Sequence, residues 1–442
     1  MSINQNVGGM AKFLSAARVK PGYISFKQRY RLATEKLPKL YGFTHKAKEF
    51  VKDVLIPNNI FCELGFEYIG PVDGHDVNEL EKSIRWARDL RRPVLLHVLT
   101  TKGKGVAYAE ANPSLYHGVS PFDPQMGMEN AASEDFSACF GRALTELAAE
   151  DEKICAVTAA MAEGTGLEPF ARRYPRRFFD VGIAEGHAVA MAGGLARQGM
   201  KPVFAVYNSF LQRAYDMLIE DWALMRLHAV VAVDRSGLVG ADGETHQGSF
   251  GLAYLSSVPA MRIFAPASYQ ELRDMLREAV TKADGPAALC YPRGGEGDYK
   301  CGWSGAAADI LREGSDLTLV THGILVNEAL RAADALLEEG IHVELIKLNT
   351  LRPMGTEAVL TSLRKTGRLI SLEECCRAGS AGTQLLAAAA SAGIAVKSVR
   401  QLDLGSGIVS HGSVSDLRRA LGIDAAGIIG AVKEMLHEKS KT

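Results

Sequence analysis

The chain has 442 residues, of which 47% are hydrophobic and 23% are charged, and its formal net charge is −1. This composition is that of an ordinary globular protein, and the near-zero charge excludes a general attraction to nucleic acid or anionic lipid. The length exceeds what one hydrophobic core usually organises, which predicts two or three domains.

The seven cysteines are scattered along the chain and lack the C-x-x-C spacing of a metal knuckle or redox pair. They fit reduced thiols in a cytoplasmic protein. The N-terminal residues lack the features of a secretory signal, and the best apolar run, residues 385–396, contains a serine and a glycine. We therefore expect a cytoplasmic protein that binds a small molecule or another subunit, and neither a membrane nor nucleic acid.

Residues 11–52 carry many lysines and arginines with interspersed aromatic residues, and they show no sustained strand pattern. We predict a mobile or helical segment here. A basic run with aromatic residues can bind nucleic acid, but a solvated helix face is the commoner explanation in a chain of neutral overall charge.

From residue 93 onward, apolar strand candidates alternate with helical patterns. This repetition of strand, crossover helix and strand predicts an α/β fold whose parallel sheets are covered on both faces. The predicted strands are residues 93–99, 154–157, 178–183, 202–207, 229–234, 287–291, 317–321, 342–348, 369–373 and 394–399.

Two segments rich in turn-forming residues suggest domain boundaries, one near residues 118–134 and the other near 295–312. They divide the chain into an N-terminal piece (1–132), a central α/β domain (133–308) and a C-terminal α/β domain (309–442). The N-terminal piece offers one convincing strand and a long irregular stretch, which is little for a self-sufficient sheet domain.

A loop rich in lysine and glycine, residues 100–105, follows the strand at 93–99 and includes Lys102. Such a loop can cradle a diphosphate, but it lacks the full G-x-x-x-x-G-K-[ST] spacing. A solvated turn explains the spacing equally well.

Glu185 lies between an apolar strand pattern, residues 178–183, and a helix of small residues. Burying an ionised carboxylate without partners is costly, so this glutamate needs a partner or a raised pKa, and either outcome suits proton transfer. The alternative is a first-turn carboxylate that faces the helix dipole.

Three arginines follow predicted strand ends, namely Arg213, Arg235 and Arg293. Loops at the carboxyl ends of parallel strands bind ligands in open α/β sheets, and guanidinium forks match phosphate oxygens. We therefore predict a phosphorylated small substrate, although each arginine alone is more typical of a surface ion pair.

The loop at residues 235–248 is rich in glycine and carries Asp242 and His246. Its glycines allow the backbone to approach a ligand, and the histidine can exchange protons near neutral pH. A structural turn capped by Asp242 is the alternative.

Five motifs occur in order along the chain. They are Gly70-Pro71-Val72-Asp73-Gly74-His75-Asp76, Ile183-Ala184-Glu185-x-His187-Ala188-Val189, Phe210-Leu211-Gln212-Arg213-Ala214-Tyr215-Asp216, Gly240-Ala241-Asp242-Gly243-x-Thr245-His246-Gln247-Gly248 and Tyr291-Pro292-Arg293-Gly294. Together they resemble the family of 1-deoxy-D-xylulose-5-phosphate synthases. The resemblance covers essentially the whole chain, and it is specific against the related transketolases and pyruvate dehydrogenase E1 subunits.

The resemblance implies a transketolase-like fold, with a partial thiamine-diphosphate domain at 1–132, a pyrimidine-binding domain at 133–308 and a C-terminal domain at 309–442. It implies condensation of pyruvate with glyceraldehyde 3-phosphate to 1-deoxy-D-xylulose 5-phosphate, with loss of CO₂, which opens the methylerythritol phosphate route to isoprenoids. Thiamine diphosphate and Mg²⁺ are the implied cofactors, and a homodimer is the implied assembly.

The resemblance also implies roles for individual residues. Glu185 would hydrogen-bond N1′ of the cofactor's aminopyrimidine and promote its activation, and His246 and His117 would lie near the reacting carbons. The other implied residues are Ile183 and Phe210 in the pyrimidine pocket, Lys102 and Tyr108 on the diphosphate side, and Tyr207, Arg213, Arg235, Asp242 and Arg293 around the substrate.

The sequence departs from the family pattern on the diphosphate side. The family's Gly-Asp-Gly and Asn-Asp-Asn motifs, which bind magnesium, do not occur, and Met1 matches a position just after the second motif. Val106 stands where the family usually has a tyrosine, with Tyr108 nearby as a substitute. We therefore expect an upstream segment or a separate chain to supply the diphosphate and magnesium ligands. The alternative is an inactive remnant that serves as a dimerising scaffold or regulatory subunit.

Overall fold

The computed structural model describes residues 60–113, 115–117, 119, 122–125, 127 and 134–437. The chain divides into two compact units, residues 1–131 and 132–442. The predicted mobile or helical segment at 11–52 lies outside the described residues. Within the described ranges, no helix is long and apolar enough to cross a membrane.

The first unit contains a parallel pair of strands, β1 (Glu67–Asp73) and β2 (Val94–Leu99), connected by helix α5 (Val77–Asp89). The short helices α4 (Ile60–Glu63) and α6 (Ala107–Ala111) come before and after this motif in the chain. The expectation of one convincing strand in this part is therefore corrected to two.

Strand β1 escaped prediction because its apolar pattern is interrupted. Its pairing with β2 shifts register between Ile69 and Val72, where Gly70 and Pro71 lie. Proline has no backbone N–H and cannot donate to a ladder, so strand pairing here is irregular.

Helix α5 presents apolar side chains that the described part of the first unit leaves uncovered. None of its residues is buried, and Val77, Ile84 and Trp86 are exposed. A parallel sheet is normally covered on both faces. This unit therefore has apolar surface that its own described residues do not bury.

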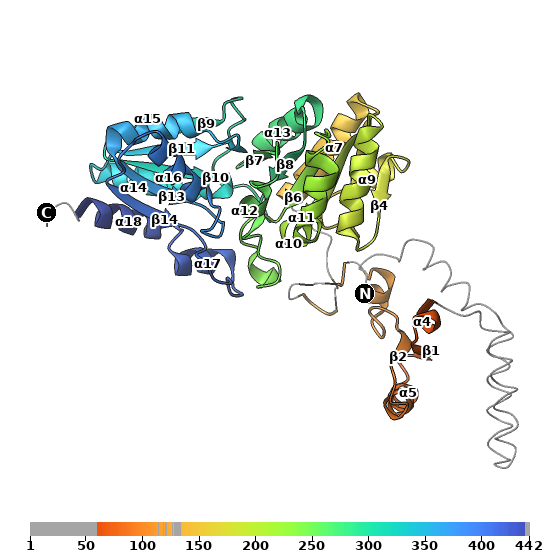
Figure 1. Cartoon of the computed structure of the whole chain (residues 1–442). Coiled ribbons are helices and arrows are strands. Elements are labelled where there is room, and N and C mark those ends of the chain that lie inside the picture. The colour runs from red at the N-terminus through yellow and green to blue at the C-terminus, as the bar shows by residue number, and fades with distance from the viewer. Residues whose placement is uncertain are drawn as a thin grey trace, which may run out of the picture. The chain divides into compact units, whose positions relative to one another are not determined.

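The second unit contains two sheets (Figure 1). The first has seven strands in the order β12-β7-β8-β6-β5-β3-β4, and β12 at one edge runs antiparallel to β7. Its strands are β3 (Ile154–Thr158), β4 (Phe178–Asp180), β5 (Lys201–Tyr207), β6 (Val230–Asp234), β7 (Arg262–Phe264), β8 (Ala287–Cys290) and β12 (Thr350–Arg352).

The second sheet has five strands in the order β14-β13-β10-β11-β9, and β9 at its edge runs antiparallel to β11. Its strands are β9 (Ala308–Arg312), β10 (Leu317–His322), β11 (Val343–Leu348), β13 (Arg368–Leu372) and β14 (Ser398–Leu402). The two antiparallel strands, β9 and β12, are short, so the sequence pattern did not predict them.

Helices account for most of the remaining chain in this unit. They are α7 (Phe136–Glu150), α8 (Glu168–Arg173), α9 (Glu185–Arg197), α10 (Asn208–Leu211), α11 (Tyr215–Met217), α12 (Gly251–Leu255), α13 (Tyr269–Lys282), α14 (Val326–Glu338), α15 (Thr356–Thr366), α16 (Ala381–Ser391), α17 (Val414–Leu421) and α18 (Ala425–His437). Short 3₁₀ or π turns lie at η2 (Gln212–Ala214), η3 (Leu218–Ala223), η4 (Gly240–Asp242) and η5 (Gly323–Leu325).

Alternate residues of the central strands enter different cores. In β5, Val203 and Ala205 pack in a core with α7 and α13, whereas Phe204 and Val206 pack in a core with α9. Successive side chains of a strand point to opposite faces, so a run of apolar residues requires helices on both sides. The predicted α/β fold with sheets covered on both faces is confirmed for this unit.

One hydrophobic core is shared by both sheets. It includes Phe204 and Val206 of the seven-stranded sheet and also Ile346 and Leu348 of the five-stranded sheet, with α15 and α16 packed against them. Strand β12 follows β11 in the chain but pairs with β7 of the other sheet. The two sheets are therefore joined by a common core and by an exchanged strand.

Two predicted strands have different bounds for local reasons. β4 ends at Asp180 rather than at residue 183, because the Asp180 carboxylate accepts from the N–H groups of Ala160 and Gly182 and turns the chain. The predicted strand 394–399 begins only at Ser398, because Ile394 N–H bonds back to Ala389 as the cap of α16.

Candidate active site

Most predicted site residues lie at the carboxyl ends of β4, β5, β6 and β8. Glu185 follows β4, Phe210 follows β5, and Arg293 follows β8, while the loop at 235–248 follows β6. These strands are parallel, so their carboxyl ends lie along one edge of the sheet. Ligands of open α/β sheets bind at such an edge.

Glu185 is the first residue of α9 and is only 4% exposed. Its Oε1 accepts a hydrogen bond of 2.5 Å from Nη1 of Arg213, whose side chain remains 58% exposed. The helix N-terminus also favours a negative charge here. The buried acid thus has the partner that its burial demands, and Arg213 lies at Glu185 instead of beside the other two arginines.

Three aromatic rings form a cluster next to the Glu185–Arg213 ion pair. Phe210 stacks on Tyr207 with ring centroids 5.5 Å apart and meets the ring of His246 edge-on at 5.4 Å. The guanidinium of Arg213 lies 5.1 Å from the centre of the Phe210 ring. Burial raises the pKa of Tyr207 to about 12, so its hydroxyl stays protonated. The half-buried Phe210 is a surface on which a flat ring can stack.

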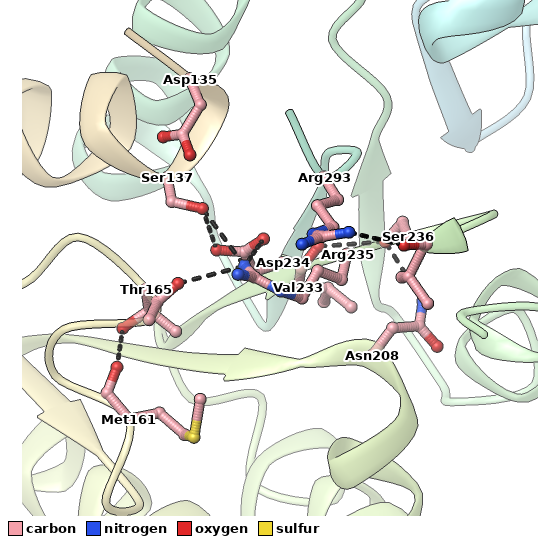
Figure 2. A network of polar contacts seen from close by, with 12 residues as sticks. Asp135, Ser137, Met161, Thr165, Asn208, Val233, Asp234, Arg235, Ser236 and Arg293 are labelled. Atoms are coloured by element: carbon pink, nitrogen blue, oxygen red, sulfur yellow. Dashed lines mark hydrogen bonds and ion pairs between the residues drawn. The ribbon is translucent and has the colours of Figure 1, made fainter. Parts of the chain in front are cut away.

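Arg235 is the centre of a polar network at the end of β6 (Figure 2). Its Nη1 donates to Oδ1 of Asp234 at 2.9 Å and to the carbonyl of Gly164 at 3.1 Å. Asp234 is fully buried, and its Oδ2 accepts from Ser137 of α7 at 2.7 Å. The guanidinium also lies 3.8 Å from the centre of the Tyr207 ring. The arginine is therefore held from several directions.

Asp242 links Arg235 to Arg293. Its carboxylate lies 3.9 Å from Nε of Arg235 and 3.4 Å from Nη2 of Arg293. Nη1 of Arg293 donates to the carbonyl of Val239 at 2.8 Å. The structure thus brings two of the three predicted arginines together around one carboxylate, which is an arrangement that can admit an anion.

The loop that carries Asp242 and His246 is anchored by the C-terminal part of the chain. Gly237 and Gly248 exchange backbone hydrogen bonds across its base, and Oε2 of Glu374 accepts from Leu238 N–H at 3.0 Å. Gly237 has φ +91°, and a Cβ there would lie 2.2 Å from the Glu374 carboxylate. A glycine is therefore required for this anchoring contact.

The remaining predicted residues lie elsewhere. Ile183, in the turn before α9, is 66% exposed. Lys102, Tyr108 and His117 belong to the first unit. The hydroxyl of Tyr108 donates to the carbonyl of Pro124 at 3.0 Å, and its ring packs against Tyr116 and Phe122. Val106 immediately precedes α6 as an exposed residue.

Sequence reasoning missed Asp234 and Ser137, although both touch the predicted arginine. The sequence pattern identifies Asp234 only as the last residue of a strand. The signal that could have found it is a charged residue at the end of a run that is otherwise Val-Val-Ala-Val. Ser137 carried no signal, because 97 residues separate it from Asp234 in the chain.

The fold and this edge of the sheet define a transketolase-like protein. Residues 133–295 match the family model of the transketolase pyrimidine binding domain, and residues 306–428 match that of the transketolase C-terminal domain. Residues 1–100 match an N-terminal model described as 1-deoxy-D-xylulose-5-phosphate synthase. The chain belongs to the 1-deoxy-D-xylulose-5-phosphate synthase family, which consists of transketolase-type transferases.

Curated relatives of this name align along almost the whole chain. The 1-deoxy-D-xylulose-5-phosphate synthase of Heliobacterium modesticaldum is 41% identical over 98% of this chain and 68% of its own length. Synthase 1 of Geobacter sulfurreducens is 42% identical over 99% of this chain and 71% of its own length. The enzyme of Aquifex aeolicus is 42% identical, with coverages of 99% and 70%.

A solved structure described as a split gene transketolase, an inactive tetramer of four β subunits, is also similar. It is 26% identical, with a TM-score of 0.63, and the match covers 69% of this chain and 99% of that one. The transketolase-like fold predicted from the resemblance is therefore confirmed.

Proposed function

We propose that this chain takes part in the condensation of pyruvate with glyceraldehyde 3-phosphate, with loss of CO₂, to give 1-deoxy-D-xylulose 5-phosphate for isoprenoid biosynthesis. The observation that carries the proposal is the buried carboxylate of Glu185 at the start of α9, next to the half-buried ring of Phe210. Arg213 contacts both groups. We further infer a cytoplasmic location, because all seven cysteines are free.

The residues present fit the aminopyrimidine part of thiamine diphosphate. Glu185 can hold a ring nitrogen, Phe210 can stack on the ring, and the exposed Ile183 can cover it. Two buried polar atoms next to Phe210 in the chain, Oδ1 of Asn208 and Oγ of Ser209, have no hydrogen-bond partner among the described residues. Orphaned buried polar groups are typical of a site that expects a polar ligand.

Bound thiamine diphosphate would supply the carbanion chemistry that removes CO₂ from pyruvate and joins the two-carbon unit to the aldehyde. In this proposal, Glu185 holds a proton at the aminopyrimidine nitrogen. Arg235 and Arg293 bind the phosphate of glyceraldehyde 3-phosphate, with Asp242 and Tyr207 beside them. His246 and His117 exchange protons with the substrate near the reacting carbons.

We propose that Mg²⁺ and the cofactor's diphosphate need ligands beyond Lys102 and Tyr108. The Gly-Asp-Gly and Asn-Asp-Asn motifs are absent from the sequence, and the hydroxyl of Tyr108 already donates to a backbone carbonyl. The exposed apolar face of α5 is consistent with further α/β structure packing on the first unit. That structure would come from another segment or another chain, and the working enzyme would be a homodimer.

Calorimetric titration of thiamine diphosphate with Mg²⁺ into the full chain tests this reading. We expect weak binding, because aminopyrimidine contacts alone leave most of the cofactor unanchored. Adding a separately expressed segment that carries both missing motifs should restore tight binding and pyruvate decarboxylation. Glu185→Gln should then lower turnover by roughly 10²- to 10⁴-fold. Micromolar binding by the chain alone would contradict the incomplete diphosphate site.

The second candidate function is a catalytically inactive scaffold or regulatory subunit. It is favoured by the likeness to a split gene transketolase that is described as an inactive tetramer of four β subunits. It predicts a stable oligomer and no turnover when the segment with the missing motifs is added. Recovery of 1-deoxy-D-xylulose 5-phosphate synthesis in that mixture would exclude it.

A further inference from the structure

We propose that Asp234, together with Ser137, is a positioning residue that holds one nitrogen of Arg235, so that the opposite edge of the guanidinium faces the oxyanion of the substrate. The identification of that oxyanion as a phosphate ester rests on the proposed function. Asp234 itself does not touch the substrate in this arrangement. It acts through Arg235.

Among the described residues, the side-chain hydrogen bonds of Arg235 all come from Nη1. Nη1 donates to Oδ1 of Asp234 at 2.9 Å, to the carbonyl of Gly164 at 3.1 Å and to Oγ of Ser137 at 3.4 Å. Nε is buried and has no hydrogen-bond partner among the described residues. A carboxylate oxygen of Asp242 lies 3.9 Å from this nitrogen. The side of the fork formed by Nε and Nη2 is therefore the side left for a ligand.

The backbone and the ring of Tyr207 fix the same orientation. Arg235 has φ +60°, a left-handed conformation that is uncommon for a residue with a side chain. Ser236 N–H donates to the carbonyl of Tyr291, which holds the chain in this turn. The guanidinium plane lies over the Tyr207 ring at 3.8 Å. Such conformations persist where the surroundings over-determine them, and they cluster at ligand sites.

Asp234 is well suited to orient a partner and poorly suited to be a simple surface ion pair. It is fully buried, and both carboxylate oxygens are used, one by Arg235 and one by Ser137. Burial raises its pKa to about 6, with Arg235 and Ser137 acting in the opposite direction. Asp135 and the buried hydroxyl of Tyr291 are the other groups that face it. A carboxylate kept in so unfavourable a place indicates a role that an apolar residue would not fill.

The geometry also identifies the chemistry of the ligand. The free edge of a guanidinium presents two parallel N–H groups, which match two oxygens of a phosphate better than they match a neutral hydroxyl. Nη2 of Arg293, 3.4 Å from the other oxygen of Asp242, extends the same positive site. A small dianionic phosphate ester fits this pair.

Positioning and simple charge attraction predict opposite signs for the same variant. Replacing Asp234 by a neutral residue removes a negative charge beside the anion site, so Coulomb attraction alone would tighten the binding of a phosphate ester. If Asp234 orients Arg235, the same replacement loosens the fork and weakens binding. The direction of the change therefore distinguishes the two explanations.

The test is a calorimetric titration of glycerol 3-phosphate, an unreactive phosphate ester, into the full chain near neutral pH. Asp234→Leu should weaken binding roughly tenfold or more, because Arg235 is no longer oriented and loses its charge-assisted bidentate contact with the phosphate. Asp234→Asn should be intermediate, since its amide can still accept from Arg235 and donate to Ser137. Binding by Asp234→Leu that equals or exceeds the wild type would overturn the proposal.

Two further variants guard against loss of folding. Ser137→Ala keeps Asp234 and removes one hydrogen bond, and we expect binding roughly threefold weaker. Glu271→Gln changes another fully buried carboxylate, whose partners are Lys347, Tyr299 and the N–H of Ala267, so it should bind like the wild type. If Glu271→Gln weakens binding as much as Asp234→Leu does, general loosening of the fold explains the effect and the positioning role is excluded.

The titration uses neither thiamine diphosphate nor turnover, so it separates two failures. A chain that binds glycerol 3-phosphate in the order wild type, Asp234→Asn, Asp234→Leu but never forms product contradicts only the proposed function. A wild-type chain that binds no glycerol 3-phosphate contradicts the phosphate site and, with it, the positioning role of Asp234.

Discussion

Asp234 and Glu271 are both fully buried carboxylates paired with a basic side chain, yet their surroundings differ. Glu271 accepts from Lys347 at 2.8 Å, from the Tyr299 hydroxyl at 2.8 Å and from Ala267 N–H at 2.8 Å. Lys347, also fully buried, donates in addition to Asn349. Asp234, in contrast, pairs with an arginine whose Nε has no hydrogen-bond partner among the described residues and whose backbone is left-handed.

The difference separates a structural ion pair, Glu271–Lys347, from a pair that can bind a ligand, Asp234–Arg235. Glu271 lies on α13 beside the seven-stranded sheet and Lys347 lies on β11 of the five-stranded sheet, so their pair ties the two sheets together. Burial lowers the pKa of Lys347, and Glu271 offsets part of that effect. Paired charges with satisfied partners stabilise one arrangement, whereas a buried pair with an orphaned donor indicates that a ligand completes it.

The largest effect on stability is expected from removing the Glu271–Lys347 ion pair. Lys347→Ala leaves the Glu271 carboxylate buried without its cation, which should lower the free energy of unfolding by about 3–5 kcal/mol. Urea denaturation followed by circular dichroism measures this change. The double variant Glu271→Leu, Lys347→Met should recover much of the loss. A Lys347→Ala chain as stable as the wild type would show that the pair does not tie the sheets together.

The pH dependence of stability should separate the two acids next. The pKa of Asp234 is about 6 in the folded chain against an ordinary value of 3.8, so between these values the folded chain binds more protons than the unfolded chain. Stability from this group therefore rises as the pH falls from about 7 to about 4, by about 3 kcal/mol. Asp234→Asn should lack this contribution.

The measurement is the difference in free energy of unfolding between Asp234→Asn and the wild type across that pH range. The difference should favour the variant most at neutral pH and should shrink as the pH falls. A difference that is constant with pH would contradict the raised pKa.

The affinity of the Arg235 guanidinium for a phosphate ester should fall even when a substitution keeps the positive charge. Arg235→Lys retains a cation but cannot make the bidentate contact, so binding of glycerol 3-phosphate should weaken roughly tenfold while stability changes little. Lys347→Arg in the Glu271–Lys347 pair is the matched control, because it also exchanges one cation for another, and it should leave this affinity unchanged. Equal affinity of Arg235→Lys and the wild type would show that the site recognises charge alone.

The smallest effect on stability is expected from removing the Arg213 side of the Glu185–Arg213 ion pair. The side chain of Arg213 is 58% exposed, so Arg213→Gln should change the free energy of unfolding by less than about 1 kcal/mol. Thermal denaturation provides the measurement, with Arg172→Gln as an exposed control in the same unit. A loss of several kcal/mol would mean that Glu185 depends on this arginine for its burial.

Much of the second unit could be predicted from the sequence, because its strands are apolar runs that require cover on both faces. The runs that became β5, β6 and β10 were located to within one residue at each end. Strands β7, β9 and β12 were not predicted, because strands of three to five residues have no distinctive pattern. β1 was not predicted either, because Gly70 and Pro71 interrupt it.

Parts of the site were predictable for a similar reason. The polar residues that follow strand ends, such as Glu185, Arg235 and Arg293, are visible as breaks in apolar runs. Which of them pair could not be predicted, because pairing depends on side-chain reach across loops. Arg213 thus lies at Glu185, and Ser137 reaches Asp234 from a helix 97 residues away in the chain.

The strand β12 (Thr350–Arg352) limits where such a chain can be divided. It follows β11 of the five-stranded sheet, yet it closes the edge of the seven-stranded sheet by pairing with β7. Cutting the gene between the two sheets would remove this edge strand from one product and leave one side of β7 unpaired, while its pairing with β8 remained. A division of the gene that keeps this pairing within one product falls before Ala132, where the compact units divide, rather than between the two sheets.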